Sequence, residues 1–431
     1  MVVVNWIVNN IFGQAGFFLG IIVLIGLIVQ KKSFGQVVQG TVKAIIGFLI
    51  IGLGAGAIVN ALLVFEPMWA EVFGLSAQGL GDFMGQEGFM AQFGTVVTLS
   101  MTIGFLINVL LARITPFKYI YLTGHMMFWT SVIFTGVVVH AAPNPNPVVL
   151  TIFISVILGV YWTFQPALNQ IFLRKIIGGD DFALGHTAGS VAFLAAVVGK
   201  FVGNPEKSTE DIKISDRWSF LRDSNIVTGL TMALLFIVGA ILLYIRNTAG
   251  AQAMIASSGD TNFVIDSILN SLRFAGGIAI VLFGVRMFVG EMVPAFKGIA
   301  TKIVPGAIPA LDCPVVYPYA PNAVIIGFLG AFAASLVWLA VLGATVGYIF
   351  VPTMIVLFFH AGTAGVFGNS TGGIRGAFIG GVITATIVAW GQFFMVTNLI
   401  SSTVPDTAMW AADSDMFIIG PIIRLLASII F

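Results

Sequence analysis

One acidic residue stands in an apolar, proline-rich segment, where an unpaired charge is costly. Residues 304–324 read VPGAIPALDCPVVYPYAPNAV and contain five prolines, Asp312 and the only cysteine of the 431-residue chain. Prolines break helices, and broken backbone in apolar surroundings must be covered by protein or line a wet cavity. Asp312 is therefore predicted to belong to an interior polar site. It also suits the cap of a short helix, and the two roles are compatible.

Two histidines, each preceded by a glycine and close to a threonine, are the other candidates for polar chemistry. His125 lies in YLTGHMMFWT near Thr123, and His186 lies in FALGHTAGS beside Thr187. A histidine in an apolar segment is more often a satisfied structural residue than a ligand group. The repeated pattern favours a role in a site, and both interpretations stay open for each histidine.

Other reactive groups are scattered. The chain has four histidines and one cysteine, without the spacing typical of a zinc site, so neither a metal nor a cofactor is predicted. His140 and His360 lie near the ends of apolar runs and are weaker candidates. Cys313 is interpreted as packing rather than as a reactive thiol. No P-loop, nucleophile elbow or HExxH motif is present, so the sequence does not predict an intramembrane enzyme.

The composition places these residues in a membrane. The chain is 58% hydrophobic and 9% charged, whereas soluble domains are roughly half apolar and about a quarter charged. Apolar runs of about 20 residues recur along it, which is long enough to cross a bilayer. The runs are continuous rather than alternating, which argues against strands. A net charge of +1 gives no basic face for nucleic acid.

The fold class predicted from these runs is an all-α polytopic membrane protein with about eleven membrane-spanning helices. Lysines and arginines cluster in alternate loops, which places the N-terminus outside. This topology is consistent only if 183–202 and 304–321 are re-entrant, entering and leaving on the same side. The spans are expected at about 15–30, 42–64, 95–112, 119–141, 147–173, 225–245, 274–292, 323–347, 350–368, 377–400 and 416–431.

A weak internal repeat indicates two inverted halves within a single transport unit. Arg113-Ile-Thr-Pro116 precedes YLTGHMMF, and Lys302-Ile-Val-Pro305 precedes ALDCPVVY. Inverted repeats commonly place a substrate site at their interface. Imidazoles, hydroxyls, an acid and aromatic rings would suit a neutral or weakly polar solute there. The predicted divisions of the chain are a first repeat at 1–202, a cytoplasmic connector at 203–223, a second repeat at 224–415 and a final helix at 416–431.

Six segments of the chain form a distinctive set of motifs. They are LTGHMMF (122–128), DFALGH (181–186), GVRMFVGEM (284–292), KGIATKIVPGA (297–307), PGAIPALDC (305–313) and YPYAPNAVIIGF (317–328). These segments resemble the ascorbate-specific membrane subunit, IIC, of the bacterial phosphotransferase system, and the similarity extends over nearly the whole chain. The resemblance implies a homodimer in the bacterial cytoplasmic (inner) membrane, with a V-motif domain for dimerisation and a mobile core domain. The core domain would carry L-ascorbate across by an elevator movement, and cytoplasmic IIB and IIA partners would supply the phosphoryl group.

By motif match, three of the candidates fall on substrate-site positions of that family, and nearby positions depart from it. Trp129 and Thr130 stand where the family has paired glutamines, and Thr187 stands where it has another. A hydroxyl or an indole makes fewer hydrogen bonds than an amide. The substrate is thus expected to be ascorbate held differently, or another small sugar acid or polyol. The expected substrate-binding residues are His125, His186, Asp312, Thr123, Trp129, Thr130, Thr187 and Phe83.

Two other classes of protein stay open on the sequence alone. An ion-coupled secondary transporter of small organic acids would need no IIB partner, and its uptake would collapse with a protonophore. A receptor or channel would not accumulate solute against a gradient.

Overall fold

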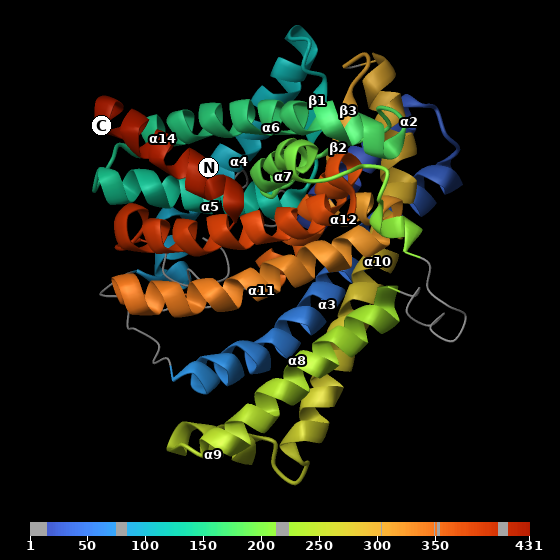
Figure 1. Ribbon diagram of the computed structural model, residues 1–431. Coiled ribbons are helices and arrows are strands. Elements are labelled where there is room, and N and C mark those ends of the chain that lie inside the picture. The colour runs from blue at the N-terminus through green and yellow to red at the C-terminus, as the bar shows by residue number, and fades with distance from the viewer. Residues whose placement is uncertain are drawn as a thin grey trace.

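Apolar helices make up most of the computed structural model, which describes residues 15–74, 84–212, 224–302, 304–348, 350, 354–403 and 413–431. Figure 1 shows the long helices. Contacts sort the helices into two groups. The first contains α2 (Ala15–Val29), α3 (Phe34–Phe73), α8 (Ser224–Arg246), α9 (Ala249–Ser257) and α10 (Phe263–Lys302). The second contains α4 (Gly85–Ile114), α5 (Gly124–Ala141), α6 (Pro147–Ile177), α7 (Gly189–Val202), α11 (Pro321–Val346), α12 (Met354–Phe394) and α14 (Ser414–Ile430). Short η2 (Thr209–Asp211), η4 (Cys313–Tyr319) and η5 (Met395–Leu399) complete the helical elements.

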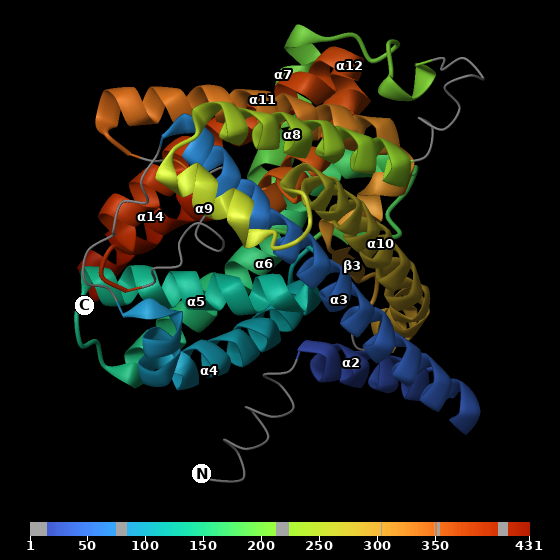
Figure 2. The ribbon, with the colours of Figure 1, turned by 90° about the horizontal axis from the view of Figure 1, so that it is seen from below.

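The first group is built on two long helices, α3 and α10, which pack along each other and against α2 (Figure 2). Each has 40 residues, or about 60 Å of helix, roughly twice the hydrocarbon thickness of a bilayer. The expected spans 42–64 and 274–292 lie inside them. Lys43 of α3 and Glu291 of α10 pair at 3.5 Å, which links the two helices.

The described helices confirm a multi-pass membrane protein. Four of them are long and apolar enough to cross a membrane by length and composition. Three shorter apolar helices accompany them in the described part of the chain. The count of eleven spans and the inverted repeats stay predictions. The long candidates are Gln92–Ile114, Pro147–Ile177, Pro321–Val346 and Val356–Leu399.

The last of these candidates is a hairpin of two helices. Gly373 breaks α12 with φ 59° and ψ −148°, a conformation that favours glycine. The arms before and after it return along each other, since a Cβ on Gly380 would lie 2.9 Å from the backbone oxygen of Ala364. Gly368 and Gly376 are in similarly close contact. Small residues permit this approach, and the two separate spans expected at 350–368 and 377–400 correspond to the arms.

The tip of this hairpin holds the first part of the connector. The N–H of Asn204 donates to the Gly372 oxygen at 3.1 Å, and the N–H of Ile374 donates to the Lys207 oxygen at 2.9 Å. The N–H of Thr209 also donates to Asn369 Oδ1 at 2.9 Å. Residues 203–212 are therefore bonded to the tip of α12, although most of them are exposed, and residues 213–223 lie outside the described part.

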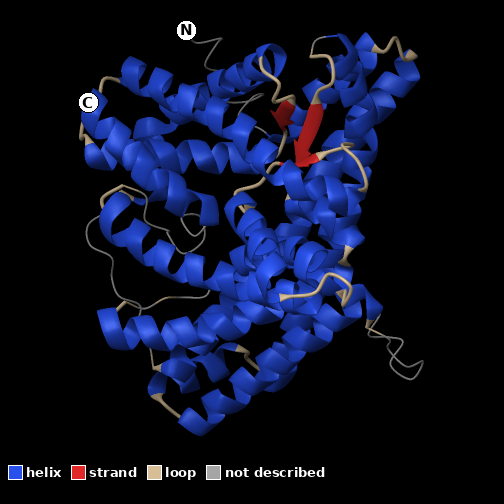
Figure 3. Ribbon diagram, turned by 45° about the horizontal axis from the view of Figure 1, so that its top comes forward, coloured by secondary structure: helices blue, strands red, loops and turns tan. Residues whose placement is uncertain are grey.

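Three short parallel strands correct the expectation of an all-α fold without strands. They are β1 (Tyr119–Tyr121), β2 (Ala183–Leu184) and β3 (Ile308–Leu311), in the order β1-β3-β2 (Figure 3). The span expected at 119–141 accordingly begins as a strand, and its helix starts only at Gly124. A parallel strand buried on both faces reads as a continuous apolar run, which is why the pattern did not distinguish it.

Amide side chains from two helices bond to backbone at the sides of this small sheet. On the β1 edge, Asn108 of α4 donates to the Tyr119 oxygen and accepts from the Tyr121 N–H, each at 3.0 Å. Beside β2, Gln170 of α6 donates to the Phe182 oxygen at 3.3 Å. Unpaired backbone in apolar surroundings is costly, so these amides allow strands to exist among membrane helices.

Candidate functional site

The sheet brings the candidate residues together because its strands are parallel. The carboxyl ends of parallel strands meet at one edge, where open α/β sheets bind ligands. Thr123 follows β1, His186 follows β2, and Asp312 follows β3 directly. The register pairs Leu184 with Leu311. The two segments expected to be re-entrant therefore meet here, each starting as a strand and continuing into a helix.

His186 and Asp312 form the centre of the site. His186 Nε2 lies 3.6 Å from Asp312 Oδ1, and their side chains are 4% and 19% exposed. The Ala188 N–H donates to His186 Nδ1 at 3.1 Å. In a neutral imidazole the other nitrogen then carries the proton, so Nε2–H faces the carboxylate.

Asp312 also caps the short helix η4. Its Oδ1 accepts from the Cys313 N–H at 2.7 Å. Both roles inferred for this residue from the sequence are therefore compatible with one geometry, since the same oxygen caps the helix and faces His186.

The buried thiol of Cys313 completes a set of three potential ligand groups. One donor atom each from His186, Asp312 and Cys313 lies within 4.8 Å of the others. These atoms are close enough to contact one small ligand. They could also surround a metal ion, although a structural zinc normally has four protein ligands.

The glycine before His186 is required by the approach of β3. A Cβ on Gly185 would lie 2.8 Å from both the carbonyl carbon and the oxygen of Ala310. The Gly185 N–H donates to the Leu311 oxygen at 2.7 Å. The two neighbouring residues therefore have separate roles. Gly185 permits the pairing of β2 with β3, and His186 faces Asp312.

The loop that leads into β2 is fixed at its polar end. Asp180 accepts from Arg174 at 2.8 Å and from Gln170 at 2.8 Å. Partial burial by itself would raise the pKa of Asp180, but the hydrogen bonds from Arg174 and Gln170 outweigh it and lower that pKa. The pair holds the entry to the strand that carries His186.

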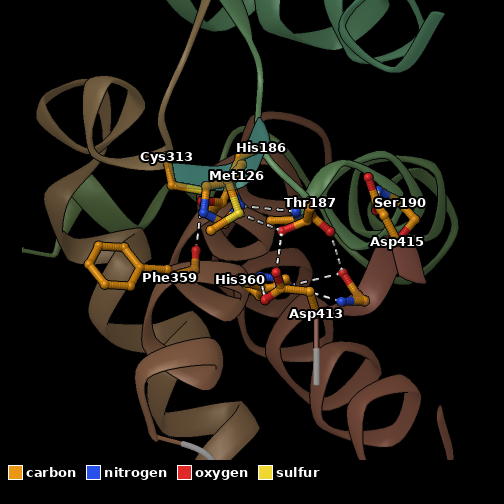
Figure 4. A network of polar contacts seen from close by, with 12 residues as sticks. Met126, His186, Thr187, Ser190, Cys313, Phe359, His360, Asp413 and Asp415 are labelled. Carbon is orange, nitrogen blue, oxygen red and sulfur yellow. Dashed lines mark hydrogen bonds and ion pairs between the residues drawn. The ribbon is translucent and has the colours of Figure 1, made fainter. Parts of the chain in front are cut away.

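A second polar group lies next to His186 (Figure 4). The His360 ring of α12 meets the His186 ring edge-on, with ring centroids 5.2 Å apart. His360 Nε2 lies 3.2 Å from Asp413 Oδ1, and its Nδ1 lies 3.0 Å from the Ser414 hydroxyl. His360 is 1% exposed and Asp413 is 4% exposed. The final helix therefore begins at the site.

The remaining predicted residues differ in what their polar atoms contact. Thr123 Oγ1 is buried and has no hydrogen-bond partner among the described residues. Thr130 donates to the Met126 oxygen of its own helix at 2.7 Å. Thr187 donates to Asp413 Oδ2 at 2.9 Å. Trp129 is buried and packs edge-on against Phe128.

Two predicted residues cannot be placed at the atomic level. The backbone of His125 lies at the second position of α5, directly after the β1 end of the site. Its side chain, and the whole of Phe83, lie outside the described residues.

Sequence reasoning missed three residues beside the pair. Gln165 of α6 donates to the His186 oxygen at 2.8 Å, while its Oε1 is buried without a hydrogen-bond partner in the described part. The sequence alone does not point to Asp413, and it makes His360 only a weaker candidate because this residue lies near the end of an apolar run. The sequence feature that could have identified Asp413 is the pair of aspartates in ADSDMF, immediately before an apolar run.

A cavity among the described residues lies away from this site. It measures about 490 Å³ and contains none of the site residues. Its lining is apolar except for Arg375. The lining residues are Val202, Ile326, Leu329, Ile374, Arg375, Phe378 and Ile379.

The chain has apolar helices interrupted by short strands, and acids and imidazoles are buried at these interruptions. These features are typical of multi-pass membrane permeases. The chain belongs to the family of PTS system sugar-specific permease components (EIIC-GAT), whose model matches residues 10–415. This confirms the resemblance inferred from the sequence motifs. Members of this family are permease components.

The chain is also similar to a curated protein of a phosphotransferase system. The chain is 25% identical over 419 residues to an ascorbate-specific PTS system EIIC component of Mycoplasma pneumoniae. The match covers 86% of this chain and 63% of the relative. The chain therefore spans less than two thirds of the length of the relative.

Proposed function

We propose that this protein is the sugar-translocating IIC subunit of a phosphotransferase system, with L-ascorbate or a related small sugar acid or polyol as its substrate. The observation that carries the proposal is the His186–Asp312 pair, at 3.6 Å. It lies where β2 and β3 pair, so one residue comes from each half of the chain. A site between the halves is the arrangement expected of a transporter built from repeats.

The surrounding groups suit a polyhydroxylated ligand. A carboxylate accepts hydrogen bonds, a neutral imidazole can do both, and sugar hydroxyls complement both kinds of group. Thr123 Oγ1 and Gln165 Oε1 are buried polar atoms without partners in the described part of the chain. Such atoms carry a desolvation cost until a ligand or water pairs with them. They support a polar ligand at this edge of the sheet.

The identity of the sugar rests on weaker support. The Mycoplasma pneumoniae relative is ascorbate-specific by name, which favours ascorbate. Thr130 and Thr187, which stand in place of family glutamines, direct their hydroxyls to Met126 and Asp413. Neither hydroxyl replaces the amide that the family has there, so other groups would hold part of the ligand, and Gln165, which donates to the His186 oxygen, supplies an amide beside the pair.

The mechanism proposed is an elevator movement followed by capture. The grouping of helices by contact, with α3 and α10 in one group and the site in the other, supports a scaffold and a moving core. A homodimer would fix the scaffold in the bacterial inner membrane. A cytoplasmic IIB partner would phosphorylate the substrate at the inner face and trap it.

A thermal-shift screen of the purified protein against sugars, polyols and sugar acids tests the substrate proposal. A ligand that binds the folded state raises its apparent stability, so ascorbate or a related compound should raise the unfolding temperature in a saturable manner. Uptake in cells that lack the phosphotransferase partners tests the coupling. Accumulation that persists there and collapses with a protonophore would contradict the IIC mechanism.

A further inference from the structure

The start of the final helix is bound to the loop that carries His186. We call Asp413, Ser414 and Asp415 the clamp. The Asp415 N–H and the Ser414 hydroxyl both donate to the Thr187 oxygen, at 3.0 and 3.1 Å. Thr187 Oγ1 donates to Asp413 Oδ2 at 2.9 Å. Main-chain and side-chain atoms of Thr187 are thus held at once.

The clamp is itself held from two further helices. His360 of α12 contacts Asp413 and Ser414 at 3.2 and 3.0 Å. Tyr161 of α6 donates to Asp415 Oδ2 at 2.8 Å, and the N–H of Ser190 in α7 donates to Asp415 Oδ1 at 2.7 Å. The residues of the clamp are all at least nine-tenths buried. Buried carboxylates are costly unless hydrogen-bonded, so this degree of satisfaction indicates a built arrangement.

We propose that the clamp is a positioning device for the substrate site, in which Asp413, held by His360, fixes the loop so that His186 Nε2 faces Asp312. The inference rests on the proposed function of that pair. The clamp residues need not touch the substrate, because they act through Thr187 and the loop backbone.

The connection from Asp413 to the ring of His186 is short. Thr187 follows His186 directly, and the next residue, Ala188, donates its N–H to His186 Nδ1 at 3.1 Å. That hydrogen bond places the proton of the neutral ring on Nε2. If the Asp413 side chain is removed, the Thr187 hydroxyl loses its hydrogen-bond acceptor, and the loop that carries His186 is less firmly held. The preference of His186 for one tautomer should then weaken.

Nitrogen NMR of the histidine rings tests this inference without any substrate. The chain has four histidines, so selective ¹⁵N-histidine labelling gives few signals, and His186→Gln assigns one set. Ring nitrogens with and without a proton have different shifts, so a single tautomer is recognisable. Asp413→Ala should move the His186 signals toward an averaged pair, whereas Thr384→Val should not. Thr384 is a suitable control because its buried hydroxyl bonds only its own helix, at the Gly380 oxygen.

Ligand affinity supplies the functional measurement. Asp413→Ala should weaken binding of the best ligand from the screen roughly ten-fold or more, since a hydrogen bond to a charged acceptor carries about that factor. Thr187→Val should weaken ligand binding by a similar factor, whereas Thr187→Ser should retain it. The Thr187→Val/Asp413→Ala double variant should bind no more weakly than the weaker-binding single variant. Asp413→Asn provides a second variant if the alanine protein does not fold.

The outcomes separate the two proposals. Unchanged His186 signals in a folded Asp413 variant would overturn the positioning role, as would independent, additive losses in the double variant. If no sugar, polyol or sugar acid binds even the wild-type protein, the proposed function fails. The histidine spectra still decide the role of the clamp in that case.

Discussion

Replacing Asp312 with asparagine separates its two roles. Asp312 Oδ1 caps η4 through the Cys313 N–H and also faces His186. The asparagine oxygen can occupy that same place, and asparagine is as good a helix cap as aspartate. The substitution therefore preserves both contacts while it removes the charge and the second acceptor oxygen.

The expected size of the effect follows from the chemistry of the acceptor. A hydrogen bond to a charged group contributes about 1.5–3 kcal/mol, and one between neutral groups about 0.5–1.5 kcal/mol. Loss of the charge should thus cost about 1–1.5 kcal/mol per ligand hydrogen bond, or roughly 5- to 15-fold in the dissociation constant. Folded yield and unfolding temperature should change little. Asp312→Ala also loses the cap, worth about 1 kcal/mol, so it should lower both affinity and unfolding temperature.

The assay is titration of ligand into purified protein, with apo unfolding temperatures measured in parallel. The ligand is whichever compound gives the largest shift in the screen. An Asp312→Asn protein that folds normally and binds with wild-type affinity would remove Asp312 from the site. A loss of stability as large as that of Asp312→Ala would show instead that the cap needs the charge.

The backbone contacts lead to three further predictions. Gly185→Ala should separate β2 from β3 and weaken ligand binding, at a cost of about 1–3 kcal/mol in stability; wild-type binding and stability would contradict the close strand approach. Gly373→Ala should cost about 1–3 kcal/mol of stability from its backbone conformation alone. The added methyl also meets connector oxygens, so the total loss should be larger, and unchanged thermal unfolding would contradict this expectation. In a Cys313→Ser background, single cysteines at Lys207 and Arg375 should both react only from the cytoplasm, since the connector and the hairpin tip are bonded; labelling from outside would overturn the topology.

The helices were predictable because their signal is local. The span expected at 147–173 falls within α6, and the span expected at 323–347 agrees with α11 to within two residues at each end. The full lengths of α3 and α10 were not predictable from the sequence. These helices extend beyond the apolar runs and include polar residues such as Glu71 and Lys302. Apolar length predicts the membrane-crossing part of a helix and not where the helix ends.

The strands escaped prediction for a different physical reason. Asn108 bonds the edge of β1 and Gln170 bonds the residue before β2, each from another helix, and such tertiary contacts leave no periodic pattern in the strands themselves. The breaks were nonetheless recognisable from prolines and glycines, and they marked the correct segments for Asp312 and His186. Asp413 was missed because its partners, Thr187 and His360, are 226 and about 50 residues away in the chain.

A map of the protein with its bound ligand, obtained by electron cryomicroscopy, tests the central proposal most directly. The best ligand from the screen should be found at the carboxyl ends of β1, β2 and β3, within hydrogen-bonding distance of His186 and Asp312. Ligand density elsewhere, for instance in the apolar cavity beside Arg375, with this edge of the sheet unchanged, would contradict it.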